Sequence, residues 1–519
     1  MKNSDDSPRS DAGASWREVV SVAFCASLLV GLASWWLYRR GYILYYGDAQ
    51  AHLNISRSII DSKTPGYDQL GSVWLPVLHL ICLPFVSNDK WWTTGLAGTI
   101  PVAACFVVSA VFFYLAAREA YGSMLAAGIT VACYTLNPNV LYLGSIPMTE
   151  VVFFAAFSTM LFALLRFRRT ENQWLVVLAA FASIAASLTR YDGWFLIPFF
   201  TAGFFLCARD RRCQTATLFL ALASLAPLYW FAHNYWETSD FLSFYRGPYS
   251  AKAIYRRALD AGLPRYRGDH EWGYAAGYYG AAGFVCAGWS LVTLGIIGLF
   301  FAVRKRRFLP VAFLGLTPAF YIWSMYSSGT PIFLPFLHSQ GYYNTRYGIA
   351  VLPLAAFAAG AIELAIPSRW QRAALAIPLL AVLPWIVSFS PEHWICWKES
   401  QVNSHSRRFW SKNAAEFFTK NYRSGDGLLL RFGDLTAILS YAGIPLKEAI
   451  HEGNGPAWLA TISRLDLLHR QKWAIAQMNQ DDSVRQAIDR ANKGHTMYQP
   501  VLEIDTLKDP VVRIYRRVE

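Results

Sequence analysis

Long apolar runs limit what this chain can fold into. A helix needs roughly 20 apolar residues to cross a bilayer, and lipid-exposed backbone must be helical or closed into a barrel. The sequence holds about eleven apolar runs that approach this length. They cover 17–38, 92–117, 122–141, 150–165, 174–189, 193–207, 214–234, 281–303, 308–325, 347–366 and 371–389. We therefore predict a polytopic α-helical membrane protein.

Composition excludes the water-soluble classes. Hydrophobic residues make up 54% of the 519 residues and charged residues 16%, whereas soluble domains carry about 25% charged residues. The net charge of +13 would indicate nucleic acid in a soluble protein. Here the basic residues cluster in short loops between apolar runs, where they report topology, and we expect no nucleic-acid partner. The eight cysteines show neither zinc spacing nor a disulfide framework.

The short basic loops predict which side of the membrane each segment faces. With a cytoplasmic N-terminus, the four most basic short loops all fall on the cytoplasmic side. They lie at 166–169, 209–212, 304–307 and 368–372. The pair Arg39 and Arg40 is the exception. Residues 1–16 are polar and are predicted to be a disordered cytoplasmic tail.

Large extracytoplasmic segments follow from this topology. They are the first loop at 39–91, a basic and aromatic loop at 235–280, and the segment 326–346. The short apolar stretch 72–86 is predicted to be a re-entrant or interfacial helix of the first loop, because a crossing there would invert the charge pattern. We expect a transmembrane domain at 17–389 and an extracytoplasmic domain at 390–519.

The sequence changes character after residue 390, where polar residues increase and long apolar runs end. Strand-like runs alternate with helical patterns, which predicts a small α/β domain. The strand-like runs are 427–431, 472–476, 500–504 and 511–515, and the helical patterns are 457–470 and 483–493. No glycine-rich phosphate loop or internal repeat is present.

The first loop carries the most informative ionisable residues. Asp48 stands at the start of an amphipathic pattern, and His52 follows it by one helical turn, so both share a face. An ionisable group beside the membrane in a polytopic protein is a functional hypothesis. The alternative is that Asp48 caps its helix, and the two roles are compatible.

Other candidates fall on the same predicted side as Asp48. Glu150 opens the run at 150–165, where the alternative is that Thr149 caps the helix and Glu150 favours its positive end. Arg190 and Asp192 lie in LTRYDGWF, a type of turn that is often structural. Arg346, in GYYNTRYGIAVLPL, is suited to bidentate phosphate binding. Its alternative is snorkelling at a span end.

These motifs together resemble a known class of enzymes. GDAQAHLNISRSIIDS is followed by GSVWLPVLHLICLPF, then by PMTE ending at Glu150 and TRYGIAVLP beginning at Thr345. This pattern resembles the GT-C membrane glycosyltransferases. The nearest branch is the dolichyl-phosphate-mannose–protein mannosyltransferase-like enzymes, which include the lipid A aminoarabinose transferases. The resemblance covers 17 to about 366 and is clearest at 41–86 and 141–150.

The resemblance implies a GT-C-like catalytic domain that transfers sugar from a polyprenyl-phosphate donor to a hydroxyl acceptor. It implies Asp48 and Glu150 as catalytic acids, with Asp48 contacting the acceptor or acting as base, and an inverting reaction. The substrate-binding candidates are His52, His79, Arg190, Asp192, Arg346 and Tyr347. His79 stands where some members carry a lysine, which is a departure from the family pattern.

We predict no cofactor, and the sequence does not support a bound divalent metal. The family's Asp-Glu pair is Asp48-Ala49 here, and Asp-X-Asp is absent. The expected partners are a polyprenyl-phosphate-linked sugar, an acceptor that is a protein, lipid or glycan, and the bilayer of a prokaryotic plasma membrane. A flippase or transporter for lipid-linked saccharides stays open, although the sequence shows no inverted repeat or midplane helix break. A third alternative, a non-catalytic partner of a surface-glycan assembly machine, also stays open.

Overall fold

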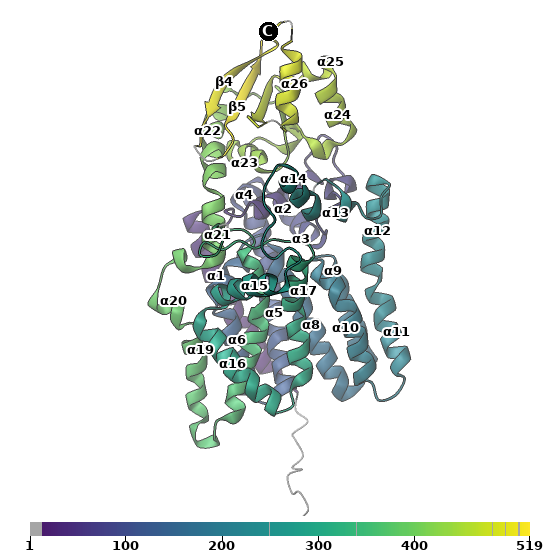
Figure 1. The fold of residues 1–519 in the computed structure, drawn as a ribbon, viewed down its shortest axis with the longest axis vertical. Helices are drawn as coiled ribbons and strands as arrows, with labels where there is room; N and C mark the ends of the chain where they lie inside the picture. The colour runs from purple at the N-terminus through teal and green to yellow at the C-terminus, as the bar shows by residue number, and fades with distance from the viewer. Residues whose placement is uncertain are drawn as a thin grey trace, which may run out of the picture.

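The computed structural model describes residues 13–248, 250–338, 340–479, 481–493, 495–506 and 509–518. A long helical body carries a small sheet at one end (Figure 1). Residues 1–12 of the predicted tail lie outside the described residues. The first helix, α1 (Trp16–Arg40), begins where Ser15 and Glu18 form a capping box.

Six of the described helical segments are long and apolar enough to cross a membrane. They are α1, α5 (Leu96–Tyr121), α8 (Thr149–Thr170), Arg212–Thr238 comprising α11 (Arg212–Ala223) and α12 (Leu225–Thr238), α17 (Phe308–Tyr326), and Thr345–Ala365. The last contains the 3₁₀ helix η2 (Thr345–Val351), α18 (Leu352–Ala361) and η3 (Ile362–Ala365). The prediction of an integral membrane protein is confirmed, while the count of about eleven spans stays a prediction.

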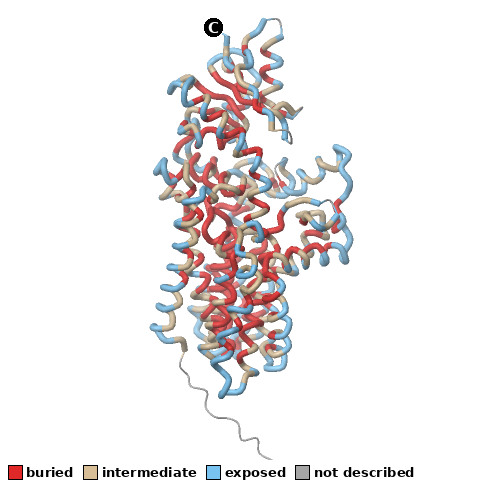
Figure 2. The backbone as a smooth tube through the Cα atoms, turned by 90° about the vertical axis from the view of Figure 1, so that its left-hand side faces the viewer, coloured by how far each residue is buried: buried red, intermediate tan, exposed pale blue. Residues whose placement is uncertain are grey.

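Shorter apolar helices fill the remaining predicted runs. They are α6 (Met124–Thr135), α7 (Pro138–Leu143), α9 (Gln173–Ser187) and α10 (Asp192–Cys207). Buried residues run along the axis of the helical body (Figure 2). The run at 371–389 is not one helix, because it divides into α19 (Ala376–Ala381) and α20 (Leu383–Val387) after η4 (Ser368–Leu375).

The prediction of one continuous span at 281–303 is wrong. The run divides between α15 (Trp272–Ala287) and α16 (Trp289–Arg304), which meet at an angle of 107°. Gly288 lies between them with φ of 82°, a conformation that glycine adopts without steric cost. Apolar composition alone carries no signal of this bend. As a result α15 packs against η2 and α17.

A close approach of α16 to α18 gives a stability prediction. A Cβ on Gly298 would lie 1.8 Å from the carbonyl oxygen of Ala358. Gly298→Ala should therefore lower the free energy of unfolding by about 1–3 kcal/mol, measured by thermal unfolding in detergent. The control is Gly315→Ala on α17, where nothing lies within 4 Å of the added Cβ. Equal unfolding midpoints for the two variants would contradict the packing argument.

The first loop folds into short helices at the end of the body that carries the sheet (Figure 1). They are α2 (Gly47–Ser58), η1 (Tyr67–Leu70), α3 (Val77–Val86) and α4 (Asp89–Thr94). The helix expected at Asp48 is present. Its N-cap is Tyr46, without a side-chain cap bond, so Asp48 does not cap it. At ten residues, α3 is about 15 Å long, too short for a core of about 30 Å.

The loop between α12 and α15 carries two short helices, α13 (Ser243–Arg246) and α14 (Ala251–Asp260). Two further helices, α21 (Ile395–Asn403) and α22 (His405–Asn421), lead into the sheet. Figure 1 shows α21 beside the upper part of the helical body, below α22, which leads up to the sheet. In addition, α21 packs against α7 and η2. The start of the tail is thus part of the helical body's surface.

The C-terminal region is a mixed α/β unit, as predicted. Its strands are β1 (Leu428–Leu430), β2 (Ala449–Ile450), β3 (Trp473–Gln477), β4 (Tyr498–Ile504) and β5 (Val512–Arg517). The order is β2-β1-β3-β5-β4, with parallel pairing from β2 to β3 and antiparallel pairing from β3 to β4. Its helices are α23 (Ala437–Ala442), α24 (Pro456–Ser463), α25 (Leu465–Leu468) and α26 (Ser483–Ala491). The two-residue β2 was not predicted.

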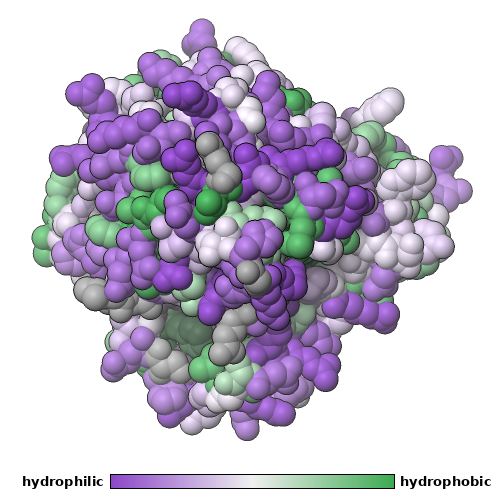
Figure 3. Space-filling model, turned by 90° about the horizontal axis from the view of Figure 1, so that it is seen from above, coloured by the Kyte–Doolittle hydropathy of each residue, from purple (hydrophilic) through white to green (hydrophobic). Residues whose placement is uncertain are grey.

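The tail is held onto the first loop by hydrogen bonds between buried groups. Gln50 Nε2 donates to Ser440 Oγ at 3.0 Å. The carboxylate of Asp61 accepts the backbone N–H groups of Leu446 and Lys447, each at 3.3 Å. Viewed from the tail end, the surface is mostly hydrophilic (Figure 3). The α/β unit therefore sits on the helix that carries Asp48, at a water-facing end of the molecule.

Candidate active site

The site is centred on one buried arginine that binds three carboxylates. Arg346 lies in η2, where its guanidinium Nη2 donates to Asp48 Oδ2. Its Nε donates to Glu150 Oε1 at 3.1 Å, and its Nη1 to Glu399 Oε1 at 3.4 Å. These carboxylates come from α2, α8 and α21. Asp48, Glu150 and Arg346, which the sequence analysis placed on one side of the membrane, therefore meet here, and Glu399 joins them.

Glu399 fixes the backbone from which Arg346 projects. Its carboxylate accepts the backbone N–H groups of Asn344 at 3.1 Å and Arg346 at 3.2 Å, and the hydroxyl of Thr345. Burial raises the pKa of the Glu399 carboxyl above its ordinary value, against the opposing attraction of Arg346. A fully buried carboxylate with this many donors is a positioning group for the start of η2.

A second arginine shares one of these acids. Arg190 Nη1 donates to Glu150 Oε1 at 3.2 Å and to Thr149 Oγ1 at 2.7 Å. Its Nε contacts Asp192 Oδ2 at 3.4 Å. Asp192 also accepts the hydroxyl of Tyr321 at 2.7 Å. Thr149 is the first residue of α8 and does not cap it, so its hydroxyl serves the arginine instead.

Tyr347 lies between the two arginines. The guanidinium carbons of Arg190 and Arg346 are each 5.2 Å from the centre of its ring. Tyr46 contacts Arg346 in the same way, at 5.0 Å. Contacts of this kind favour a desolvated cation. These ring contacts thus help to stabilise two guanidinium groups that carry the same charge and lie close together.

The three acids on Arg346 differ in exposure. The side chain of Asp48 is 38% exposed, while those of Glu150 and Glu399 are 3% and 2% exposed. Asp48 is therefore the one of the three that a substrate can reach from solvent. Glu150 Oε2 is buried and accepts no hydrogen bond from any residue that the structure describes, which leaves an acceptor position inside the site.

The two candidate histidines contact each other. His52 Nδ1 and His79 Nε2 are 2.9 Å apart, and the His52 ring lies 4.5 Å from that of Trp74. Burial, with smaller effects from Arg346 and Arg190, lowers the pKa of His52 to about 3. Burial, together with His52, lowers the pKa of His79 well below its usual range. Both imidazoles are therefore neutral at physiological pH.

Acid should destabilise the protein through this histidine pair. Their folded-state pKa values lie below the ordinary 6.5, so the unfolded chain takes up the protons first. The contribution of His52 is complete above about pH 6.5 and is lost as the pH falls toward its pKa of about 3, by about 1.4 kcal/mol per pH unit. His79, whose pKa is lowered in the same direction, steepens this loss. Thermal unfolding in detergent from about pH 7 to about pH 4 measures this slope.

The control for this slope is an exposed histidine. His52→Gln should flatten the dependence of the unfolding midpoint on pH, whereas His393→Gln, at an exposed position, should retain it. The slope is compared, and not the midpoint itself, because the glutamine also changes packing. A variant at His52 with the wild-type slope would show that this imidazole already carries a proton in the folded state.

Sequence reasoning missed Glu399 and Tyr321. Glu399 lies after the last apolar run in WKES, a stretch with no motif that distinguishes it. Tyr321 is one aromatic among several in the run at 308–325. Among the described residues, no group of three or more His, Cys, Asp and Glu side chains is arranged to hold a metal ion.

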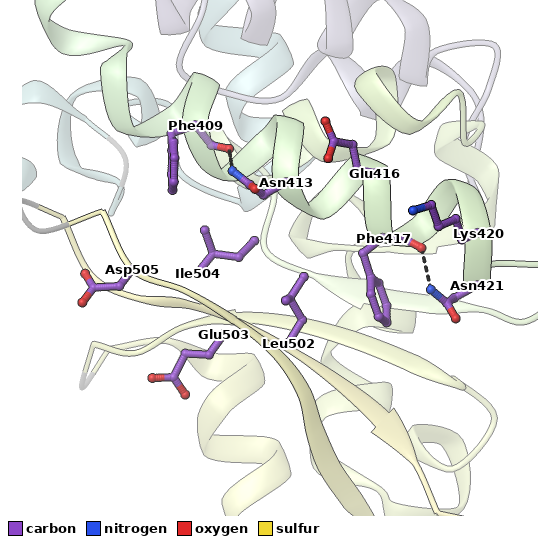
Figure 4. A pocket seen from close by; sticks show the side chains of 10 residues that line it. All are labelled: Phe409, Asn413, Glu416, Phe417, Lys420, Asn421, Leu502, Glu503, Ile504 and Asp505. Carbon is purple, nitrogen blue, oxygen red and sulfur yellow. Dashed lines mark hydrogen bonds between the residues drawn. The ribbon is translucent and has the colours of Figure 1, made fainter.

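A groove of about 410 Å³ lies elsewhere, between α22 and β4 (Figure 4). Phe409 and Phe417 from the helix and Leu502 and Ile504 from the strand form its apolar part. None of the predicted site residues lines it. The groove is therefore separate from the arginine–carboxylate cluster.

The fold is similar to that of ArnT, a likeness that extends over nearly the whole chain. Crystal structures of ArnT from Cupriavidus metallidurans match it over nearly the whole length. The undecaprenyl phosphate-bound form has a TM-score of 0.53 at 13% identity, covering 96% of this chain and 98% of ArnT. The apo form has a TM-score of 0.53 at 15% identity, covering 94% and 97%. Likeness at this identity shows the fold alone.

A family model matches part of the chain. The model described as dolichyl-phosphate-mannose-protein mannosyltransferase matches residues 93–236. The resemblance to GT-C glycosyltransferases of the mannosyltransferase and ArnT type is thereby confirmed. The archaeal oligosaccharyltransferase AglB from Archaeoglobus fulgidus, solved with an inhibitory peptide and a dolichol-phosphate, has a TM-score of 0.44 at 13% identity, covering 97% of this chain and 75% of AglB. That likeness is too weak to carry an argument. The comparison with curated proteins gave no match.

Proposed function

We propose that this protein is an inverting glycosyltransferase that moves a sugar from a polyprenyl-phosphate donor to a hydroxyl acceptor. The observation that carries the proposal is the pairing of one accessible carboxylate, Asp48, with a buried arginine, Arg346, that two buried carboxylates hold in place. Such an arrangement supplies a base and an anion-binding cation side by side. The ArnT fold and the mannosyltransferase family match support the same class of reaction.

The donor phosphate is expected to displace Asp48 from Arg346. Nε and Nη1 of the guanidinium face the buried Glu150 and Glu399, whereas Nη2 faces the exposed Asp48. A phosphate oxygen entering from solvent can therefore exchange with Asp48 at Nη2 alone. Binding of the donor then satisfies the arginine and frees the Asp48 carboxylate for the acceptor. The guanidinium of Arg346 in this way couples donor binding to the release of the base, Asp48.

The reaction proceeds as a direct displacement. The acceptor hydroxyl attacks the anomeric carbon while Asp48 takes its proton, a transfer that contributes about 10²–10⁴-fold to rate. The bond from the anomeric carbon to the phosphate oxygen breaks, and polyprenyl phosphate leaves with the electron pair. Arg346 offsets the charge that develops on this phosphate. Attack opposite the leaving group inverts the anomeric centre.

Glu150 is expected to orient a substrate hydroxyl. Its Oε1 accepts from both arginines, whereas its buried Oε2 has no donor within the described part of the chain. A buried carboxylate oxygen without a donor is costly, and a sugar hydroxyl would supply one. Arg190, Asp192 and Tyr347 then hold Glu150 and Arg346 in register, while His52 and His79 border the site as neutral imidazoles.

The site is proposed to face the extracytoplasmic side of a prokaryotic plasma membrane, with a cytoplasmic N-terminus. Glu150 stands in the first turn of α8 and Asp192 in the first turn of α10. The basic stretch 166–169 lies at the other end of α8, within its last turns, and 209–212 follows the other end of α10. Because cytoplasmic loops carry the excess of Lys and Arg, the acids belong on the opposite side.

Sugar transfer to an acceptor in vitro tests the proposal. Purified protein would be incubated with a panel of radiolabelled polyprenyl-phosphate sugars and membrane extracts, and the labelled product identified. Asp48→Asn is the paired control. Label that leaves the lipid in the wild type and stays on it in the variant supports the proposal. If no radiolabelled sugar is transferred from any of the lipid donors to any acceptor fraction, the proposal is overturned.

One observation favours the flippase alternative. The helices α15 and α16 are separated by a sharp bend, and transporters commonly contain helices that are broken near the membrane midplane. The same labelled lipids in sealed vesicles separate the two functions. Movement of intact lipid-linked sugar across the bilayer without transfer would favour a flippase.

A further inference from the structure

Two buried cysteines meet beneath the site. Cys286 is in the last turn of α15, and Cys396 is in the first turn of α21. Burial and, after it, the neighbouring Cys286 thiol raise the pKa of the Cys396 thiol. Both side chains are fully buried free thiols. The two positions are far apart in sequence, so cysteine spacing gave no signal of their contact.

One asparagine aligns the two backbones. Asn139 Nδ2 donates to the carbonyl of Cys286 at 3.0 Å, and Asn139 Oδ1 accepts the backbone N–H of Cys396 at 3.0 Å. The two cysteine backbones are therefore joined through a single amide group. The shared asparagine thus keeps the two cysteines on neighbouring stretches of main chain.

We propose that Cys286 and Cys396 are oxidised during folding to a structural disulfide that joins α15 to α21. The oxidant is a disulfide of a protein or small molecule on the extracytoplasmic side, where disulfides persist. A thiolate of the pair attacks the oxidant and forms a mixed disulfide with release of one thiol. The second cysteine then displaces the second thiol. Overall, two protein thiols lose two electrons and two protons, and one oxidant disulfide becomes two thiols.

The bond forms while α21 docks on the helical body. In the folded protein both thiols are shielded, and burial raises the pKa of Cys396, which keeps its reactive thiolate scarce. Exchange is therefore fast before docking and slow afterwards. A disulfide once formed is likewise shielded from reducing thiols.

The position of the dithiol gives the disulfide a role at the site. Cys286 Sγ contacts the carbonyl of Thr345 at 3.3 Å, and the Thr345 hydroxyl binds Glu399. Glu399 follows Cys396 by three residues on α21. A covalent bond here would hold the tail's first helix against η2 and so fix Glu399 next to Arg346. The inference rests on the extracytoplasmic orientation proposed above and not on sugar transfer.

Mass spectrometry of the whole chain tests the proposal. Membranes would be isolated without reductant in the presence of excess N-ethylmaleimide, and the protein unfolded, purified and digested. We expect a linked peptide pair containing Cys286 and Cys396, and an intact chain with two of its eight cysteines unalkylated. Prior reduction should restore full alkylation and release the two peptides.

Two variants identify the bond. Cys396→Ser should abolish the linked pair and leave Cys286 alkylated, whereas Cys213→Ser, at an exposed position, should retain it. Recovery of both Cys286 and Cys396 as alkylated thiols in the unreduced wild type would overturn the proposal. So would a disulfide that joins either of them to a different cysteine. Because the readout is mass, a failed transfer assay leaves it unaffected.

Discussion

Replacing Asp48 by asparagine should reduce sugar transfer by about 10²–10⁴-fold. The amide keeps the size and one acceptor oxygen, so it can still pair with Arg346, but it cannot take a proton from the acceptor hydroxyl. The turnover number should therefore fall while donor binding and the unfolding midpoint stay close to those of the wild type. Single-turnover transfer from a radiolabelled donor measures the loss.

An acid of the same loop outside the cluster is the matched control. Asp68 lies in η1 and is exposed, so Asp68→Asn should retain wild-type turnover. Partial activity of Asp48→Glu, compared with Asp48→Asn, would support proton transfer, because glutamate restores the carboxylate at a displaced position. Near-normal turnover of Asp48→Asn would rule out Asp48 as the base.

The fold could be predicted in outline because its main signals are local. Apolar runs, loop charges and alternating strand and helix patterns each depend on neighbouring residues, and the membrane helices and the α/β tail were predicted from them. The bend at Gly288 was missed, because its cause is a backbone angle within a uniformly apolar run. The two-residue β2 was missed because it is a strand only through its pairing with β1, which lies elsewhere in the sequence.

The candidate site residues that the sequence analysis named are those beside the end of a predicted span. Asp48, Glu150, Arg190, Asp192 and Arg346 all lie there, and they meet in one cluster. Topology placed them on one side of the membrane but not in contact. Their pairing depends on how α2, α8 and η2 pack.

Glu399 shows the limit of that reasoning. Its four hydrogen bonds exist only because α21 folds back onto η2, more than 50 residues away in sequence. The expected boundary at residue 390 placed Glu399 in the tail domain, apart from the site. The tail is therefore expected to affect catalysis through Arg346 as well as through any contact with an acceptor.

Replacing Arg346 should weaken donor binding, and lysine is the more informative substitution. Alanine would leave Glu150 and Glu399 buried without a cation, at a cost to stability of about 3–5 kcal/mol. Lysine keeps the charge but presents one ammonium group, which cannot bind both buried carboxylates and a phosphate in the geometry of the planar fork. Arg346→Lys should therefore fold and still raise the donor KM by about tenfold or more, since one charged hydrogen bond contributes about 1.5–3 kcal/mol.

Glu399→Gln separates the position of Arg346 from its charge. The one carbonyl oxygen of glutamine can still accept from the Thr345 hydroxyl and the Arg346 backbone N–H, but the amide group replaces the oxygen that accepts from Asn344 and the guanidinium, and one negative charge beside the guanidinium is lost. If Glu399 only positions the arginine, this variant should raise the donor KM less than Arg346→Lys does. Donor titrations of initial transfer rate, with unfolding midpoints recorded in parallel, measure both effects. An Arg346→Lys enzyme with an unchanged donor KM would mean that the lipid phosphate binds elsewhere, and the exchange at Nη2 would then have no part in releasing Asp48.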